Sequence, residues 1–129
     1  MNAFPIPITA VFAALLALLL VILSVRVTLL RRRKKVSLLD GGDGDLARAM
    51  RVQGNFVEYV PLALMLIGMA EWMRAPVWLV YLLAVLLLLT RISHAFGLTL
   101  GKFPARAFGA AGTWFVLVAA ALVVLVRAA

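Results

Sequence analysis

The sequence contains no cysteine and only one histidine, His94. The first absence excludes disulfides, thiolate-bound metals and a cysteine nucleophile. The second rules out metal sites built from several imidazoles, so we expect no bound metal. Charged residues are also scarce: they make up 14% of the 129 residues, whereas 66% are hydrophobic. Soluble domains are nearer one quarter charged, so a mean hydropathy of +1.12 indicates a membrane protein. The length suits a single domain, residues 1–129.

Acidic residues number only five against 13 lysines and arginines, which leaves a net charge of +8. An excess of this kind can indicate nucleic-acid binding, but no soluble domain is present to carry such an interface. In a membrane protein, basic residues collect in loops on the cytoplasmic side. We therefore expect membrane lipids, and not nucleic acid, to surround this chain.

Four apolar segments, at about residues 6–30, 46–73, 76–98 and 107–126, are each long enough to cross a bilayer as a helix. Helices satisfy their own backbone hydrogen bonds in lipid, so the sequence predicts an all-α, four-helix transmembrane bundle. The first segment has no basic stretch before it and no convincing cleavage site. We interpret it as a retained span and not as a signal peptide.

The connections between the spans differ in length and charge. Residues 31–45, RRRKKVSLLDGGDGD, form the longest, and Asp43 or Asp45 could cap the helix that follows. Lysines and arginines concentrate beside the first and third connections, whereas the other side has only Arg74 and Arg127. The positive-inside rule then predicts cytoplasmic first and third loops, with both termini outside, in a bacterial inner membrane.

Four polar residues share one stripe at the start of the second span. With 100° per residue and Arg51 at 0°, Arg48 falls at about 60°, Asn55 at about 40° and Glu58 at about −20°. Charges inside a span are costly and normally face a partner or a wet cavity. The stripe therefore predicts a polar site at the cytoplasmic end of this helix.

The other spans bring polar residues to the same end. Arg91 and His94, three residues apart, share a face of the third span. Arg106 opens the fourth span there, and Arg26 lies near the end of the first. We predict that these side chains and the stripe surround a common, water-accessible hollow.

Structural interpretations of the same residues stay open. Arg26, Arg31 and Lys102 could extend to the interface as ordinary snorkelling cations. Glu58 could neutralise an arginine, Asn55 could join two helices, and His94 could be a packed histidine. At the opposite end, we expect Glu71 and Arg74 to pair.

The chemistry of the site suggests its ligand. Guanidinium groups bind carboxylates or phosphates in bidentate fashion, and a glutamate among them suits an ammonium group. A zwitterionic peptide with two carboxylates meets both requirements. Because the chain has no cysteine, any thiol chemistry needs a thiol from the ligand, and a nearby arginine would favour the thiolate.

The segment ARAMRVQGNFVEYVPLALMLIGMAE resembles the signature of the MAPEG proteins, the membrane-associated proteins of eicosanoid and glutathione metabolism. Arg51, Asn55, Glu58 and Pro61 match the pattern of that signature. RISHAFGL is similar to the family's third-helix segment, and Arg106 stands where the family has an arginine. The chain looks closest to short bacterial members.

This resemblance implies a homotrimer with glutathione, as co-substrate, bound between neighbouring subunits and open to the cytosol. It implies that Arg51, Asn55, Glu58 and His94 hold glutathione, and that Arg106 stabilises the thiolate. Arg48 and Arg91 are added as ligand-binding residues because they line the same predicted site. Gly54 and Leu98 depart from the eicosanoid enzymes, which have a basic residue and a tyrosine at these places.

The expected function is therefore a glutathione-dependent transferase or peroxidase for hydrophobic electrophiles that enter from the bilayer. Two alternatives remain. The chain has the size of a small proton-coupled multidrug transporter, in which Glu58 would carry protons. It could also be a non-catalytic bundle whose polar residues form a structural network.

Overall fold

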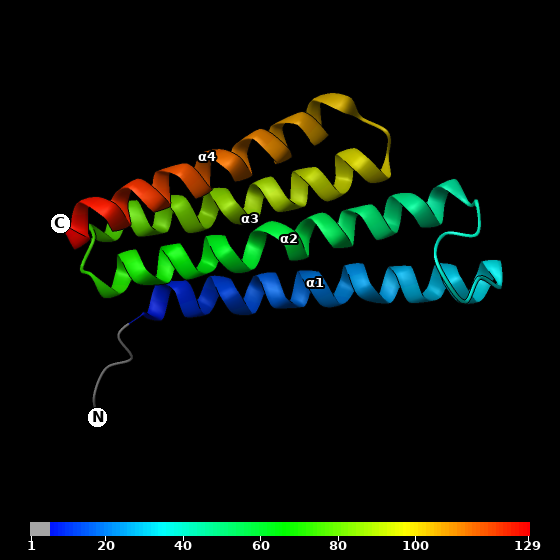
Figure 1. Ribbon diagram of the computed structural model, residues 1–129, viewed down its shortest axis with the longest axis horizontal. Helices are drawn as coiled ribbons and strands as arrows, with labels where there is room; N and C mark the ends of the chain where they lie inside the picture. The colour runs from blue at the N-terminus through cyan, green and yellow to red at the C-terminus, as the bar shows by residue number, and fades with distance from the viewer. Residues whose placement is uncertain (1–5) are drawn as a thin grey trace.

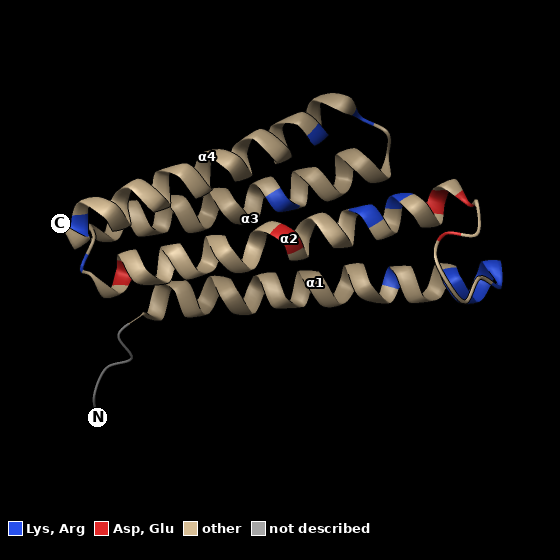
Figure 2. Ribbon diagram, in the orientation of Figure 1, with Lys and Arg blue, Asp and Glu red and all other residues tan. Residues whose placement is uncertain are grey.

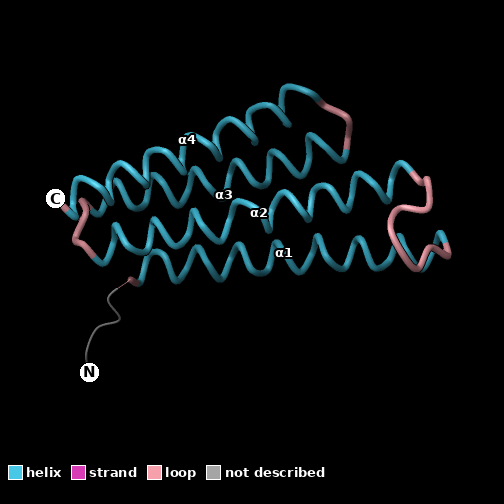
Figure 3. The backbone as a smooth tube through the Cα atoms, viewed as in Figure 1, coloured by secondary structure: helices cyan, strands magenta, loops and turns pink. Residues whose placement is uncertain are grey.

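A computed structural model describes residues 6–129 as four α-helices in an up-and-down arrangement (Figures 1 and 3). The helices are α1 (Pro7–Lys34), α2 (Gly44–Trp72), α3 (Val77–Thr99) and α4 (Phe103–Ala128). Each is long and apolar enough to cross a membrane, which confirms the predicted all-α four-helix bundle. The first and third loops lie at one end of the bundle, and the chain's C-terminus lies at the other (Figure 1).

Two helix ends differ from the predicted spans. α1 continues to Lys34 instead of ending near residue 30, and α4 begins at Phe103 instead of near residue 107. Four cations occupy the last turn of α1, where the helix dipole favours positive charge. Pro104 lies in the first turn of α4, where its missing N–H costs nothing. The apolar segments therefore indicate the membrane-spanning parts, and the helices of the structure extend beyond them.

Three helices end at a residue in the left-handed conformation: Lys35 with φ 57°, Arg74 with φ 56° and Gly101 with φ 68°. Each is followed by a backbone N–H that reaches five residues back, as from Val36 to the Arg31 carbonyl at 3.0 Å. This Schellman geometry satisfies the last carbonyls of a helix and turns the chain sharply. It keeps sequential helices close as antiparallel neighbours.

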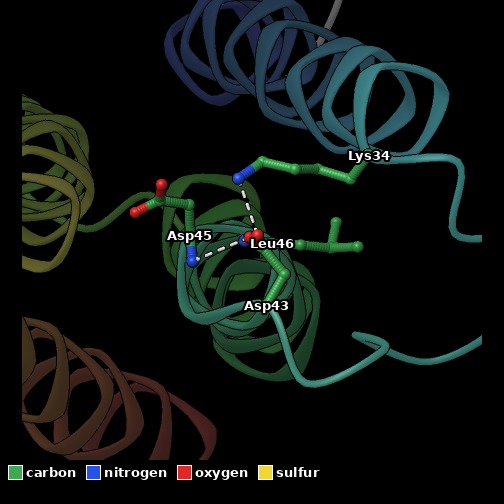
Figure 4. A network of polar contacts seen from close by, with 4 residues as sticks. All are labelled: Lys34, Asp43, Asp45 and Leu46. Carbon is green, nitrogen blue, oxygen red and sulfur yellow. Dashed lines mark hydrogen bonds and ion pairs between the residues drawn. The ribbon is translucent and has the colours of Figure 1, made fainter.

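Asp43 caps α2, as one of the two predicted alternatives. Its carboxylate accepts the backbone N–H groups of Asp45 at 3.1 Å and Leu46 at 2.9 Å. The Lys34 ammonium lies 2.6 Å from the other carboxylate oxygen, so the same residue joins the end of α1 to the start of α2 (Figure 4). The hydrogen bond from Lys34 and those from the cap amides lower the pKa of Asp43 below its usual 3.8.

The predicted pair of Glu71 and Arg74 is wrong. The Glu71 carboxylate instead accepts the backbone N–H groups of Ile8 at 2.9 Å and Thr9 at 2.8 Å. These amides belong to the first turn of α1 and have no partner within their own helix. A carboxylate also suits the positive end of the helix dipole. Glu71 therefore fastens the start of α1 to the end of α2.

The interior consists mainly of aliphatic side chains, among which Leu16, Ile67, Leu83 and Val116 are almost fully buried. α3 and α4 approach most closely, because Gly109 lies directly against the backbone of His94. A Cβ atom on Gly109 would lie 2.6 Å from the His94 Cα. Large apolar side chains also cover the outside of the bundle, as expected where lipid replaces water.

Candidate ligand site at the basic end of the bundle

The end formed by the first and third loops carries most of the positive charge, and we call it the basic end (Figure 2). All the residues predicted to form a ligand site lie on the half of α2, α3 or α4 toward this end, except Glu58, which lies at the middle of α2. The predicted clustering along the bundle axis therefore agrees with the fold. Their burial and partners differ, however, and divide them into an inner and an outer group.

Arg91 is the centre of the inner group. Its side chain is only 2% exposed and joins three helices. Nη1 donates to the Asn55 Oδ1 at 2.7 Å on α2, and Nη2 donates to the Gly109 carbonyl at 3.1 Å on α4. Nε finds no acceptor among residues 6–129. Both acceptors are neutral, so the guanidinium has no counter-charge in direct contact within the part of the chain described.

His94 lies one turn further along α3 and is also buried. Its backbone and Cβ pack against Gly109, which accounts for the close contact of α3 and α4. Its imidazole makes no hydrogen bond to any residue from 6 to 129. The backbone of His94 is therefore packed, as the structural interpretation predicted, while its ring nitrogens have no partner among residues 6–129.

The outer group is formed by Arg51, Glu58 and Arg48, which are all exposed on α2. The Arg51 Nη1 lies 3.3 Å from the Glu58 Oε1, with side-chain exposures of 65% and 50%. Glu58 thus neutralises Arg51 and not Arg91. Among residues 6–129 these groups form an open surface, because no other helix covers them.

Arg106 forms no hydrogen bond or ion pair with either group within residues 6–129, but its backbone packs against Gly97 on α3, close to His94. It is exposed in the first turn of α4, with its guanidinium 5.3 Å from the centre of the Phe103 ring. It lines a small cavity of about 80 Å³ together with Leu98 and Lys102, and neither Arg51 nor Arg91 reaches this cavity. None of the cavities described among residues 6–129 is lined by all three arginines, so the common hollow stays a prediction.

Other polar contacts near the basic end were not visible in the sequence. Arg26 donates to the Thr99 Oγ1 at 2.5 Å and joins α1 to α3, so it is more than a snorkelling cation. Gln53 donates to the Ser24 Oγ at 2.8 Å between α1 and α2. The Gly109 carbonyl is a site acceptor that no side-chain pattern could have indicated.

The family of the chain follows from comparison with known proteins. The model of the MAPEG family matches residues 9–126, nearly the whole sequence and all four helices. This chain is a MAPEG protein. Among MAPEG relatives is the inner membrane protein YecN of Escherichia coli, in strains K12 and O6:H1. It is 37% identical over 110 residues, which cover 85% of this chain and 84% of YecN.

The residues matched by the family model include the polar residues of the candidate site. Arg51, Asn55 and Glu58, which resemble the family's signature, lie on α2 within the matched residues, and Arg91 donates to Asn55 from α3. Of these three residues, Asn55 joins two helices, whereas Arg51 and Glu58 are exposed. Within residues 6–129, no three histidine, aspartate or glutamate side chains gather in a way that could hold a metal ion.

Proposed function

We propose that this MAPEG protein is a glutathione-dependent transferase or peroxidase of a bacterial inner membrane. The observation that carries the proposal is the buried Arg91 guanidinium, held by Asn55 and Gly109 without a carboxylate. A buried cation with only neutral partners is costly unless an anion approaches it. The signature pair Arg51 and Glu58 lies exposed on the same helix as Asn55.

Glutathione supplies two carboxylates, one ammonium and one thiol. Arg51 and Arg48 would bind a carboxylate, and Glu58 would exchange its contact with Arg51 for the ligand's ammonium. Asn55, Arg91 and His94 would hold the remaining polar groups of the peptide. These roles use the exposed charges of α2 and the unpaired imidazole nitrogens of His94.

Arg106 would stabilise the glutathione thiolate, which forms when the thiol proton passes to water. In the transferase reaction the thiolate sulfur forms a bond to an electrophilic carbon, and the electron pair of the broken bond leaves with the displaced group. In the peroxidase reaction the sulfur attacks a peroxide oxygen, the O–O bond breaks, and the alkoxide leaves and takes a proton from water. A second glutathione then converts the sulfenic acid to glutathione disulfide and water. Holding the thiolate beside a bilayer-borne substrate would supply much of the rate enhancement.

The proposal includes assembly as a homotrimer with glutathione between subunits. Arg51 and Glu58 are exposed on a membrane-spanning helix, and charges that face lipid are expensive. A neighbouring subunit would cover them and could bring its Arg106 toward the α2 signature. Such an arrangement would supply the enclosure that one chain lacks.

We further propose that the basic end faces the cytoplasm, with both termini outside. The concentration of cations at this end supports that orientation (Figure 2). Glutathione is then taken from the cytosol, while the hydrophobic substrate arrives through the bilayer. Reporter fusions at both termini test the orientation, since a reporter active only in the cytoplasm should stay silent.

The direct test is titration of the purified protein with glutathione, followed by the ultraviolet absorbance of the thiolate. We expect a saturable signal that Arg106→Gln removes and that Arg51→Gln shifts to higher glutathione concentration. Arg127→Gln, at the opposite end of α4, is the matched control and should leave the signal unchanged. A protein without any saturable signal would refute the proposal.

A non-catalytic bundle is the second candidate, because the bonds from Arg91 to Asn55 and Gly109 would also serve as a purely structural network. In that case Asn55→Ala should lower the melting temperature, while Arg51→Ala, which lies outside this network, should change neither the melting temperature nor any glutathione signal. A ligand site predicts that Arg51→Ala changes glutathione binding and leaves stability nearly constant. The two variants measured together decide between the candidates.

A further inference from the structure

A second polar feature of the basic end lies on α1, away from the signature of α2. It is a groove of about 560 Å³, which we call the α1 groove. Its polar lining consists of Arg26, Arg33 and Asp45, and its apolar lining includes Ile22, Val25 and Leu29. The volume is within the range of about 300–1,000 Å³ found for small-molecule sites.

The order of these residues along the helix is informative. Ile22, Arg26, Leu29 and Arg33 recur at the spacing of one helix face. At 1.5 Å per residue, Arg33 lies about 10 Å closer to the helix end than Arg26, and Ile22 lies about 6 Å deeper than Arg26. The groove therefore changes from cationic near the helix end to apolar further into the membrane. A phospholipid has the same order, with a charged headgroup above an acyl chain.

The two arginines are available to an anion. Arg33 donates to no acceptor and forms no ion pair among residues 6–129. Arg26 uses Nη1 for Thr99 and has no second acceptor within the same range, so its guanidinium is held in place with donors to spare. Because this side chain is already ordered before binding, a ligand would bind with a smaller loss of conformational entropy.

Asp45 adds a requirement for the headgroup. Its side chain forms no ion pair with any residue from 6 to 129, and it faces away from Lys34 in Figure 4. The neighbouring Asp43, by contrast, is paired with Lys34. A carboxylate beside two guanidiniums suits a ligand that has a phosphate and also a hydroxyl donor.

We propose that the α1 groove binds an anionic phospholipid of the phosphatidylglycerol type. The phosphate lies between Arg26 and Arg33, a glycerol hydroxyl donates to Asp45, and an acyl chain lies along Ile22 and Val25. The other cations of this run, Arg31, Arg32, Lys34 and Lys35, do not line the groove and raise the local concentration of anionic lipid. This proposal does not depend on glutathione binding.

The test is native mass spectrometry of the full-length protein in neutral detergent with added lipid. We expect more phosphatidylglycerol than phosphatidylcholine of equal chain length to be retained, and about tenfold weaker phosphatidylglycerol binding in Arg33→Gln. Arg32→Gln is the matched control, because it removes the same charge one residue away, outside the groove, and should have a much smaller effect.

Three results would overturn the proposal. Equal retention of both lipids would remove the requirement for an anionic headgroup. Equal losses in Arg33→Gln and Arg32→Gln would reduce the effect to general surface charge. Displacement of the lipid by soluble glycerol phosphate would show that the apolar walls contribute nothing. Because Arg33 is exposed, its variant should fold normally, which the unchanged melting temperature of the lipid-free protein can verify.

Discussion

The contact between α3 and α4 and the outward face of α2 contain the same residue types in opposite surroundings. Each has an arginine and a glycine, Arg91 and Gly109 in the first, Arg51 and Gly54 in the second. Arg91 is 2% exposed and bonded to two helices, and Gly109 is in direct contact with the backbone of His94. The Arg51 side chain is 65% exposed, and a Cβ on Gly54 would meet nothing within 4 Å.

The difference separates residues whose packing and hydrogen bonds are satisfied within one chain from residues that the chain leaves exposed. Around Gly109 the neighbouring backbone would have to move to accommodate any change in volume or hydrogen bonding, so such a change should lower the stability of the fold. Around Gly54 a change meets only lipid, a ligand or a second subunit. Substitutions in the first region should therefore alter stability, and those in the second should alter binding. The variants below test this division.

The largest effect is expected for Gly109→Ala. The added methyl group would lie 2.5 Å from the His94 Cβ, and backbone would have to move to admit it. We expect a loss of about 3 kcal/mol, at the upper end for overpacking, measured as a lower melting temperature in detergent. Gly54→Ala is the matched control and should stabilise the protein by about 0.5–1 kcal/mol, because alanine favours a helix. Similar losses in both would contradict the division.

The two glutamates of α2 give the next largest contrast. Glu71→Gln replaces charge-assisted bonds to the Ile8 and Thr9 amides with weaker ones, and we expect a loss of about 2 kcal/mol. Glu58→Gln removes an exposed ion pair, which is typically worth about 0.2–1 kcal/mol. Glutathione binding should show the reverse order, with Glu58→Gln the weaker binder. If Glu71→Gln left the melting temperature unchanged, the proposed fastening of α1 to α2 would be wrong.

A smaller contrast is expected for Asn55→Ala and Arg51→Gln. The first removes the acceptor of the buried Arg91 Nη1 and should cost about 1 kcal/mol, as is typical of a hydrogen bond between membrane helices. The second affects a group that the other helices of the chain do not enclose, and it should cost less, a few tenths of a kcal/mol. Thermal unfolding of both variants without glutathione measures this. Equal losses would assign Arg51 to the structural network.

The sequence predicted the number of spans, a cap by Asp43 or Asp45, and the end of the bundle at which the polar residues gather. These features follow from local rules: length, hydropathy, capping chemistry and helical periodicity. The bond from Arg91 to Asn55 was not predictable in detail, because periodicity gives a face and a depth but not the partner. The Gly109 carbonyl is a backbone acceptor and has no side-chain signal at all.

The errors have related causes. Glu71 and Arg74 are three residues apart, which favours a local pair, but Arg74 adopts the left-handed conformation that ends α2. The unpaired amides of α1, more than sixty residues away in the chain, then become the better partner for Glu71. Helix ends were misjudged because charge was taken as the boundary of a helix, whereas charge marks the boundary of the lipid. Both errors concern contacts or conformations that hydropathy does not encode.

The smallest effect concerns Asp43, which joins α1 and α2 outside the membrane-spanning part. Its pKa is lowered in the folded protein, chiefly by Lys34, so its contribution to stability is present above about pH 3.8 and is lost as the pH falls through the lower folded value. Asn also caps helices, so Asp43→Asn removes the charge and keeps the cap. The melting temperature of Asp43→Asn should therefore be slightly below that of the unaltered protein at neutral pH, and the two should converge in acid. A difference in melting temperature that persists unchanged below the folded pKa would mean that Lys34 does not act through the Asp43 charge. In that case Lys34→Gln, which removes the same ion pair from the other side, should have no effect at neutral pH.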